Sequence, residues 1–477
     1  MRFDTVIGLE VHAELATATK IFCACTTKFG GAPNTQTCPV CLGLPGALPV
    51  LNKRAVEFCI RAGLALRCEI AKFSKMDRKN FFYPDMPKAY QISQYDLPLC
   101  RDGFLTLDCG KKIRINRIHL EEDAGKLTHS TGTERYSLVD YNRAGVPLIE
   151  IVSGPDLSTP AEAVEYLEKL QRILEYLEIS DCKMAEGSLR CDANISLKPI
   201  DREELGTKTE LKNLNSFKAL SRALDYEIKR QSELLAAGQA VRAETRKWDE
   251  AKQQTLSIRS KEETQDYRYF PEPDLVPIEL DPAYIAGIAK SLPELPDEKK
   301  QRFMADYGLP EYDADLITSA KRLAEFFEAV NAWYFNPKAA SNFIMGELLR
   351  LLGEEQLKSA EIPVNPASFG DLLKLIDEGE ISVSVGKQVF AQMFRTGAAP
   401  EEIIKAEGFK QISDETQLLA VINKAIKDHP QSVQDYLGGK EKAAGFLVGQ
   451  IMRETKGQAN PKLLKDLLHR ELEKLKE

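Results

Sequence analysis

One short segment of the chain, residues 138–156, combines carboxylates, an amide and a guanidinium with turn-forming glycine and proline. Its polar members before the bend are Asp140, Asn142 and Arg143. Glu150 follows inside an apolar run, between Ile149 and Ile151. If this run is a strand, its period of two places Glu150 on the face opposite both isoleucines. Because a carboxylate in such a run costs free energy unless it is paired or metal-bound, Glu150 is a candidate for a binding site.

The run 9–15, with the sequence LEVHAEL, alternates apolar and polar side chains. In a strand this alternation places Glu10, His12 and Glu14 on one face and the apolar residues on the other. Two or three of these polar side chains could therefore reach the same ion.

Magnesium is the ion that such a set favours, because it takes hard oxygen ligands and usually keeps water and substrate phosphates. Glu10, Glu121 and Glu150 are candidate carboxylate ligands. His12 is a less usual magnesium ligand and could act through water. Each of these residues taken singly is more typical of a surface or hydrogen-bonded position, so the pattern alone leaves both interpretations open.

Four of the ten cysteines form two close pairs, Cys23 with Cys25 and Cys38 with Cys41, separated by 12 residues that contain glycine and proline. This spacing fits a tetrahedral four-cysteine zinc site that staples a loop, and reduced structural thiols are the alternative. The other cysteines show no comparable pairing and are expected to be small buried side chains. They are Cys59, Cys68, Cys100, Cys109, Cys182 and Cys191.

Residues 190–196 are expected to form a strand with one polar face. Arg190, Asp192, Asn194 and Ser196 alternate there with apolar residues. An ordinary half-exposed strand has the same pattern. The chain contains no glycine-rich Walker A loop, which excludes a P-loop kinase.

Composition indicates a large protein with more than one core, since 477 residues with 43% hydrophobic content exceed the size of a single typical domain. The first residues lack a signal-peptide pattern, and no apolar stretch approaches the roughly 20 residues that span a membrane. We therefore expect a cytoplasmic protein with no membrane association. The net charge of −8 argues against a uniformly basic surface but leaves room for a local basic patch that binds RNA.

The elements that must position these residues follow from periodicity and turn signals. Up to about residue 290, strand-like and helical stretches mix with Gly, Pro and Asn turns, which predicts an α+β domain. The capping box formed by Thr159 and Glu162, with Pro160 in the first turn, predicts a helix through Leu177. A second helix is expected from Ser216 to near Gly238.

Beyond residues 292–296 the apolar spacing of three and four predicts an almost entirely helical region. A second boundary is expected at 397–400. Residues 440–477 carry nine Lys/Arg and six Asp/Glu, a local charge of +3. This bias, including the segment 456–462, is compatible with a surface that contacts a phosphate backbone, although a solvated helical face has the same charge.

Several long stretches, in order along the chain, resemble the GatB/GatE family, the B subunits of the glutamyl-/aspartyl-tRNA amidotransferases. The segment 138–156 resembles the family's signature, and the resemblance extends over the whole length. The other matching stretches are 5–15, 79–91, 119–126, 186–196, 212–216 and 266–274.

The resemblance implies an α+β, cradle-like catalytic domain at 1–292, an all-helical domain at 293–398 and a small helical tail domain at 399–477 that binds tRNA. It also implies ATP-dependent phosphorylation of the side-chain carboxylate of glutamyl-tRNA(Gln), aspartyl-tRNA(Asn) or both, followed by amidation with ammonia. Because some members of the family lack the four cysteines, any zinc is expected to be structural.

The resemblance further implies roles for individual residues. Glu10, His12, Glu121 and Glu150 become candidates for catalysis and magnesium binding. Contacts to ATP are expected from a larger polar set. This set comprises Ser74, Lys79, Tyr83, Arg190, Asp192, Asn194, Ser196 and Lys208.

Partners are implied as well, because the chain shows no evident glutaminase or amidase arrangement of its own. An amidase partner that hydrolyses glutamine and a further small partner would complete a heterotrimer, with a tunnel that delivers ammonia. Lys79, Lys88 and Glu122 could line or gate this path, and structural salt bridges are an equally compatible use. Two alternatives stay open: a noncatalytic tRNA-binding scaffold, and a free-standing ATP-dependent amide ligase for a small metabolite.

Overall fold

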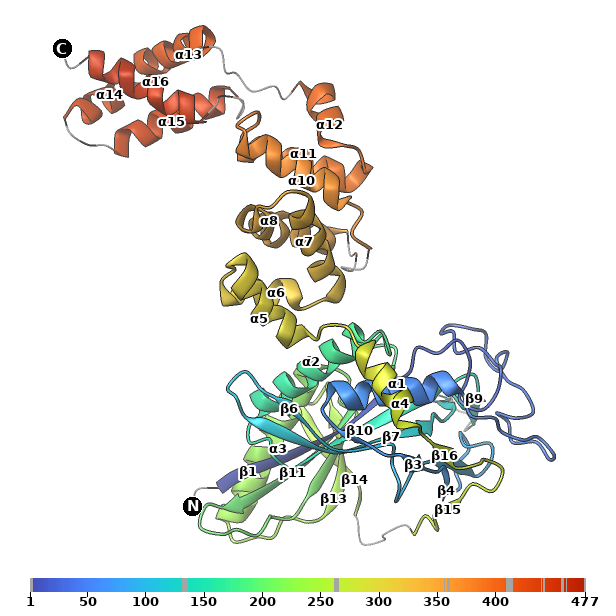
Figure 1. Cartoon of the computed structure of the whole chain (residues 1–477). Helices are drawn as coiled ribbons and strands as arrows, with labels where there is room; N and C mark the ends of the chain where they lie inside the picture. The colour runs from blue at the N-terminus through green and yellow to red at the C-terminus, as the bar shows by residue number, and fades with distance from the viewer. Residues whose placement is uncertain are drawn as a thin grey trace. The chain divides into compact units, whose positions relative to one another are not determined.

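The computed structural model forms two compact units, Met1–Leu295 and Pro296–Glu477 (Figure 1). Within the described residues, the strands all lie in the first unit and the second unit is helical. The predicted fold class, an α+β domain followed by helices, is therefore confirmed. The described residues are 3–130, 136–260, 266–355, 357, 361–408, 415–438, 440, 442–455, 459 and 461–475.

A nine-stranded sheet forms the centre of the first unit, in the order β14-β13-β12-β11-β1-β10-β7-β6-β2. Strands β12 and β13 are parallel, and the other neighbouring pairs are antiparallel. The strands are β1 (Phe3–Glu14), β2 (Glu69–Ile70), β6 (Cys100–Thr106), β7 (Lys112–Glu122), β10 (Pro147–Ser153), β11 (Leu189–Pro199), β12 (Thr209–Lys212), β13 (Glu244–Asp249) and β14 (Gln254–Ser260).

One face of this sheet is buried beneath helices. In β1, Leu9, Val11 and Ala13 are at most 1% exposed, as the alternation of the sequence predicts. They share one apolar core with residues of helices α1 (Lys53–Ala65), α2 (Pro160–Tyr176) and α3 (Phe217–Ala236). Figure 1 shows α1 and α2 along one side of the sheet. The opposite face is left for polar side chains.

Local signals fix the ends of these helices. The hydroxyls of Thr159 and Ser216 accept hydrogen bonds from the first turns of α2 and α3, so both predicted helices are confirmed to within a few residues. The capping box differs in one bond, because the Glu162 carboxylate accepts from the Ser158 N–H rather than from that of Thr159.

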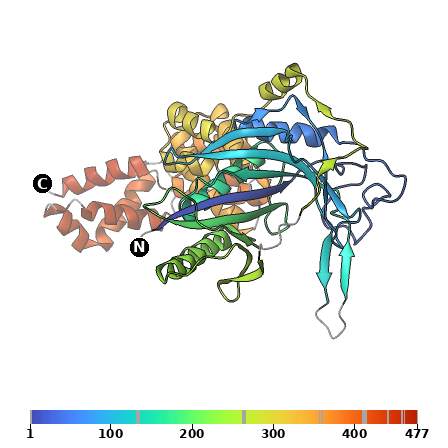
Figure 2. The same ribbon diagram turned by 90° about the horizontal axis from the view of Figure 1, so that it is seen from below.

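Short strands build smaller sheets beside the large one. Strands β15 (Phe270–Pro271), β4 (Asp77–Asn80) and β5 (Tyr90–Ser93) form a three-stranded sheet, and β16 (Ile278–Glu279) pairs with β3 (Phe73–Ser74). Strands β8 (Lys126–His129) and β9 (Ser137–Asp140) form a hairpin that stands out from the unit in Figure 2. Helix α4 (Pro282–Lys290) follows these strands.

The helical unit contains two separate apolar cores. The first core is built by α5 (Pro296–Tyr307), α6 (Glu311–Thr318), α7 (Lys321–Trp333), α8 (Pro337–Phe343), the π-helical turn η1 (Ile344–Leu348), α9 (Leu349–Glu354), α10 (Pro366–Asp377), α11 (Val383–Thr396) and α12 (Pro400–Glu407). The second core is built by α13 (Glu415–Asp428), α14 (Pro430–Leu437), α15 (Lys442–Glu454) and α16 (Pro461–Lys474).

Helix α12 departs from the expected boundary at 397–400. Gly397 ends α11 in the left-handed conformation, φ 71°, but Ile403 of α12 is buried in the same core as α10 and α11. The predicted boundary therefore coincides with a tight turn inside a packed unit, and the tail core begins after α12. Most of the predicted segment 456–462 lies outside the described residues.

Two further observations concern the cysteines and the membrane. Cys109 is exposed, which corrects its expected burial, because it lies in the turn between β6 and β7. The other five isolated cysteines are buried, as predicted. Across the described part of the chain, none of the helices combines the length and apolar character that crossing a membrane requires.

Candidate functional site

Three neighbouring strands, β1, β10 and β7, bring acids and histidines together on the polar face of the large sheet. In the strand pairing, His12 lies opposite Glu150, and Glu150 lies opposite His119. Glu10 lies two residues from His12 in β1, and Glu121 lies two residues from His119 in β7. The pleat of the strands therefore directs these side chains to the same face of the sheet. The residues expected for magnesium are thus assembled by strand order, although they are far apart in sequence.

Distances within this acid cluster are short. His12 Nε2 lies 3.3 Å from Glu150 Oε2 and 3.7 Å from Glu121 Oε1. His119 Nε2 lies 3.4 Å from Glu121 Oε2 and 3.5 Å from Glu150 Oε2. A ligand atom of Glu10 lies within 4.8 Å of those of His12 and Glu150. One pair of carboxylates, Glu121 and Glu150, therefore serves both imidazoles.

Burial makes the charges of this cluster interdependent. Glu121 and Glu150 are 3% and 6% exposed. Burial opposes ionisation of Glu150, but the charges and hydrogen bonds of His119 and His12 hold its pKa below the usual range. Burial likewise disfavours the charged form of His12, yet Glu150 and Glu121 raise its pKa to about 9. The buried carboxylate is thus ionised and the His12 imidazole is protonated at neutral pH.

The donor set fits a hard cation. Burial and the nearby Glu150 raise the pKa of Glu10, so this carboxylate gains from a positive charge between the two acids. Ligand atoms spread over as much as 4.8 Å suit magnesium, which binds one or two carboxylates and keeps several waters. Arg117 Nη2, 3.4 Å from Glu150 Oε1, and Ser93 Oγ, 3.1 Å from Glu121 Oε2, orient the acids from outside.

Strand β11 borders this cluster with two ion pairs. Arg190, opposite His12 in the pairing, donates from Nη2 to Asp123 Oδ2 at 2.7 Å. Asp192, opposite Glu10, accepts from Lys212 Nζ at 2.5 Å. Both side chains lie on the polar face that their alternation predicts.

The other residues expected for ATP are dispersed. Asn194 and Ser196 continue the polar face of β11, away from the acids. Lys79 and Tyr83 line a separate hollow, and Lys208 is exposed just before β12. Ser74 is 0% exposed, and its hydroxyl donates to Leu97 O at 2.6 Å. The Ser74 hydroxyl is therefore buried and already hydrogen-bonded, and its expected contact with ATP stays a prediction.

Lys88 and Glu122 form a buried ion pair, and Glu122 directly follows Glu121 of the acid cluster along β7. Lys88 Nζ donates to Glu122 Oε2 at 2.6 Å, and the Ile92 N–H donates to Glu122 Oε1 at 2.8 Å. Both side chains line a cavity of about 160 Å³ that also reaches Cys23 and Cys41. Lys79 lines a different hollow, so the structure brings together only two of the three residues expected for the ammonia path.

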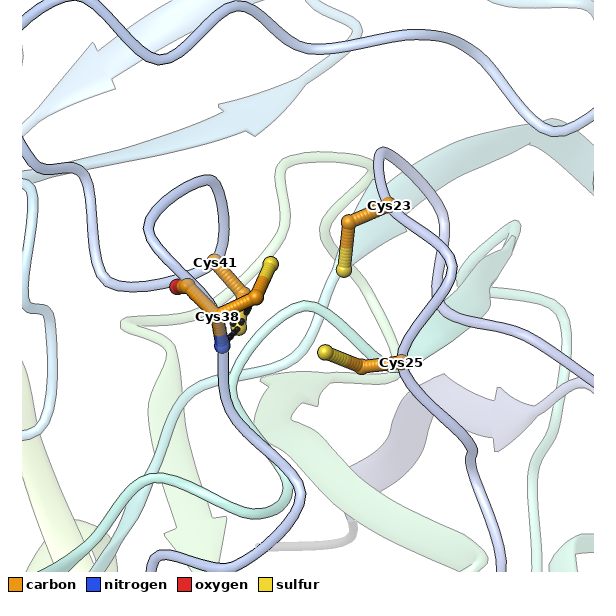
Figure 3. A group of neighbouring side chains, drawn as sticks. All are labelled: Cys23, Cys25, Cys38 and Cys41. Atoms are coloured by element: carbon orange, nitrogen blue, oxygen red, sulfur yellow. Dashed lines mark hydrogen bonds between the residues drawn. The ribbon is translucent and has the colours of Figure 1, made fainter.

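The four predicted zinc ligands converge on one point, with their sulfur atoms turned towards one another (Figure 3). The four Sγ atoms lie within 4.8 Å of one another, and those of Cys38 and Cys41 are 3.9 Å apart. Zn–S bonds of about 2.3 Å in a tetrahedron require S···S separations of about 3.8 Å. The cluster therefore fits zinc with small side-chain rotations.

Electrostatics favour thiolate at one member of this cluster. A hydrogen bond from the Cys23 thiol, the Cys38 N–H and the charge of Lys20 lower the pKa of Cys41 to about 4, against the effect of burial. The Cys38 N–H lies 3.1 Å from Cys41 Sγ, and Lys20 Nζ lies 3.7 Å from it. A preformed thiolate with these donors is typical of a structural metal site.

Comparison with known proteins gives the family. The GatB/GatE catalytic domain matches residues 5–286, and the GatB domain matches residues 325–472. Relatives that align over nearly the whole chain carry the name of the B subunit of aspartyl/glutamyl-tRNA(Asn/Gln) amidotransferase. Those of Thermoanaerobacter pseudethanolicus and Caldanaerobacter subterraneus are 61% and 60% identical, each over 99% of this chain and 100% of its own length. That of Clostridium tetani is 52% identical over 100% of both chains.

The chain belongs to the GatB/GatE family. Within this family member, the structure adds residues to the site that sequence reasoning did not select. His119 is the main addition, and its place two residues before Glu121 is the signal that could have identified it. Asp123 and Arg117 join through ion pairs with Arg190 and Glu150.

Tyr269 is another addition to the GatB/GatE site. Burial and then the charges of Glu121 and Glu150 raise the pKa of its phenol. Its ring stacks on that of Tyr95, with 4.2 Å between centroids. The sequence held no spacing that links residue 269 to the acids, since the two regions meet only through folding.

Proposed function

We propose that this GatB/GatE family member is the activating component of a tRNA-dependent amidotransferase. It would phosphorylate the side-chain carboxylate of glutamyl-tRNA(Gln), aspartyl-tRNA(Asn) or both with ATP, and then amidate the phosphorylated group with ammonia. The observation that carries this proposal is the row of His12, Glu150 and His119 on adjacent strands, flanked by Glu10 and Glu121. The names of the relatives support the choice of reaction.

The acids are proposed to hold magnesium. Glu10, Glu121 and Glu150 offer hard oxygens, and His12 would bind the ion or one of its waters. When bound, the cation would neutralise nucleotide phosphates as negative charge shifts during phosphoryl transfer. Without the ion, protonated His12 balances the charge of the ionised Glu150. His12 would give up its proton as a bound cation takes over this charge balance.

Binding of ATP is assigned to groups around the acids. Arg190, Asp192, Asn194 and Ser196 provide the polar face of β11, and Lys208 lies next to β12. Arg190 is proposed to orient ATP from a fixed position, because its hydrogen bond to the buried Asp123 holds the side chain in place. Lys79 and Tyr83 belong to the separate hollow rather than to this group.

Ammonia is proposed to come from an amidase partner that hydrolyses glutamine, within a heterotrimer completed by a further small partner. The Lys88–Glu122 pair is the candidate that this chain offers for the path, because it lines a small cavity and Glu122 directly follows Glu121 of the acid cluster along β7.

The remaining parts receive supporting roles in the proposal. The four cysteines would hold a structural zinc that fixes the loop lining the cavity. The helices from α5 to α12 and the tail core, α13 to α16, are proposed to grip the body of the tRNA. A cytoplasmic location is proposed because ATP and acylated tRNA are found there.

A noncatalytic scaffold is the second candidate. Its acids would stabilise the fold or an interface, and their ion pairs with His12, His119 and Arg117 are compatible with that role. It predicts that residual turnover follows the amount of assembled complex. The proposed catalytic role predicts that assembly survives while carboxylate activation fails.

The test is amidation of glutamyl-tRNA and aspartyl-tRNA by the copurified complex with magnesium and ATP, using glutamine or ammonium. Glu150→Gln keeps the shape of the side chain and removes its charge. Glu168→Gln, at an exposed position of α2, is the matched control. A Glu150→Gln complex that assembles and binds tRNA but loses ammonium-supported amidation supports the proposal, and full activity of this variant refutes it. Amidation of a small metabolite without tRNA would instead identify a free-standing ligase.

A further inference from the structure

An aromatic hollow of about 540 Å³ lies in the first unit and has no part in the chemistry of the acid cluster. We define the aromatic hollow by six of the side chains that line it. These are Lys79, Phe81, Phe82, Tyr83, Asp266 and Tyr267. Two segments of family resemblance, 79–91 and 266–274, meet here through the hydrogen bond from the Asn80 N–H to Tyr267 O, at 2.9 Å.

Its rings are unusually accessible for large apolar groups. Phe82 is 89% exposed and Tyr83 is 53% exposed. Tyr267 stands edge-on to Phe81, with 6.2 Å between ring centroids, which leaves ring faces open to a planar ligand. Large apolar groups that are exposed together and bordered by polar residues are a feature of binding sites.

A cation completes the set. The Lys79 ammonium lies 4.9 Å from the centroid of Tyr267 and 6.0 Å from that of Phe81. Aromatic faces beside a lysine are the combination that holds single-stranded nucleic acid, because bases stack on the rings and the ammonium attracts phosphate. Asp266, on the rim, offers oxygens to the polar edge of a base.

The aromatic hollow is connected to the acid cluster through a continuous set of packed groups. Tyr267 contacts Tyr269 at 6.1 Å between centroids, and Tyr269 stacks on Tyr95. Two residues before Tyr95, Ser93 donates to Glu121 of the acid cluster. The same three-stranded sheet, β15-β4-β5, carries both Lys79 and Ser93. Ser93 lies opposite Asp77, two residues from Lys79, so Lys79 and Ser93 stand on the same face of this small sheet.

We propose that the aromatic hollow binds the unpaired 3′-terminal nucleobase of the acylated tRNA, which stacks on Phe82 and Tyr267 while Lys79 contacts a backbone phosphate. This inference rests on the proposed function. The amino acid is esterified to the ribose of the terminal nucleotide, so its side-chain carboxylate and its base must occupy neighbouring sites. The openness of the aromatic hollow suits a chain end that enters from solvent, whereas small cofactors are mostly enclosed.

If one base stacks on these rings, removal of either aromatic side chain should weaken the binding of tRNA by a predictable factor. Phe82→Leu and Tyr267→Leu each take away the aromatic face and keep an apolar side chain. In the full complex, with ammonium as donor, each is expected to raise the KM for tRNA about fivefold to about 100-fold and to leave the KM for ATP unchanged. Phe82→Tyr and Tyr267→Phe, which keep a ring, should be close to native. Phe73→Leu is the control, since Phe73 is 47% exposed outside the aromatic hollow.

A tRNA that lacks only its terminal base identifies the ligand. The native complex should bind this abasic RNA at least as weakly as the Phe82→Leu complex binds intact RNA, and Phe82→Leu should weaken binding of the abasic RNA no further. A raised KM for ATP with an unchanged KM for tRNA would assign the aromatic hollow to the adenine of ATP and overturn the proposal. Loss of assembly with the partner proteins would assign it to a protein interface and overturn it as well.

The two proposals fail in different ways. If the native complex shows no ATP-dependent amidation, the proposed function itself is wrong. If the native complex is active, and the leucine variants fold, assemble and keep a native KM for tRNA, only the stacking proposal is wrong. Measuring tRNA binding without ATP, with 2-aminopurine as the terminal base, adds a readout that needs no turnover, because stacking quenches its fluorescence.

Discussion

Removal of one partner of the buried Lys88–Glu122 pair should destabilise the first unit strongly. Side-chain exposure is 9% for Lys88 and 4% for Glu122. Glu122→Gln leaves the lysine charge buried without its counter-charge, which costs about 3–5 kcal/mol when a buried pair is broken. The Ile92 N–H, which donates a hydrogen bond to Glu122, can still donate to the glutamine oxygen. The loss of stability therefore comes mainly from the missing charge.

Urea unfolding followed by tryptophan fluorescence measures this loss, because Trp248 is buried in the core of the first unit. With an m-value of about 3 kcal/mol/M, the midpoint of this unit should fall by about 1–1.7 M. The double variant Lys88→Met with Glu122→Gln removes both charges and should recover most of the midpoint. A single variant within about 0.3 M of native, or a double variant no better than the single, would refute the assignment of a desolvated pair.

The same variants separate a structural role from a role in delivering ammonia. If the pair lies on the ammonia path, the double variant should keep ammonium-supported amidation and lose most glutamine-supported amidation. If it is only structural, both activities should fall together with the folded fraction. The ratio of the two rates, measured on the assembled complex, distinguishes the cases.

Two further predictions concern the cysteine cluster and an ion pair near the surface. The purified protein should contain one zinc per chain. Cys41→Ser or a strong chelator should remove the zinc and lower the thermal midpoint of unfolding by several degrees. Cys109→Ser should change neither the zinc content nor the midpoint, and metal analysis with calorimetry measures both. The hydrogen bond and charge of Arg114 lower the pKa of Asp156 in the folded protein. This carboxylate therefore stabilises the fold at a pH above its pKa in the unfolded chain, and the stabilisation is lost as the pH falls through its pKa in the folded protein. Asp156→Asn should therefore cost about 0.5–1 kcal/mol at neutral pH and progressively less under acid conditions, and equal costs at both pH values would contradict the assignment.

Much of the local structure and part of the site follow from sequence alone. The alternation of residues 9–15 sets the polar and buried faces of β1, because side chains of a strand alternate whatever the strand pairs with. Thr159 and Ser216 start their helices through hydrogen bonds to the next residues. The spacing of four cysteines places their sulfur atoms together because a short loop limits the distance between the pairs.

Other features required the tertiary structure, because they depend on which distant segments pack together. The order β1-β10-β7 brought His119 into the acid cluster, and no local signal encodes which strands become neighbours. Folding also separated Lys79 from Lys88 and Glu122, and it buried Ser74 completely. Sequence patterns report interactions over a few residues, whereas strand order and burial are decided by the free energy of packing the whole unit. The sequence by itself thus determined the chemical groups and the faces on which they stand, and the tertiary structure decided which of them meet.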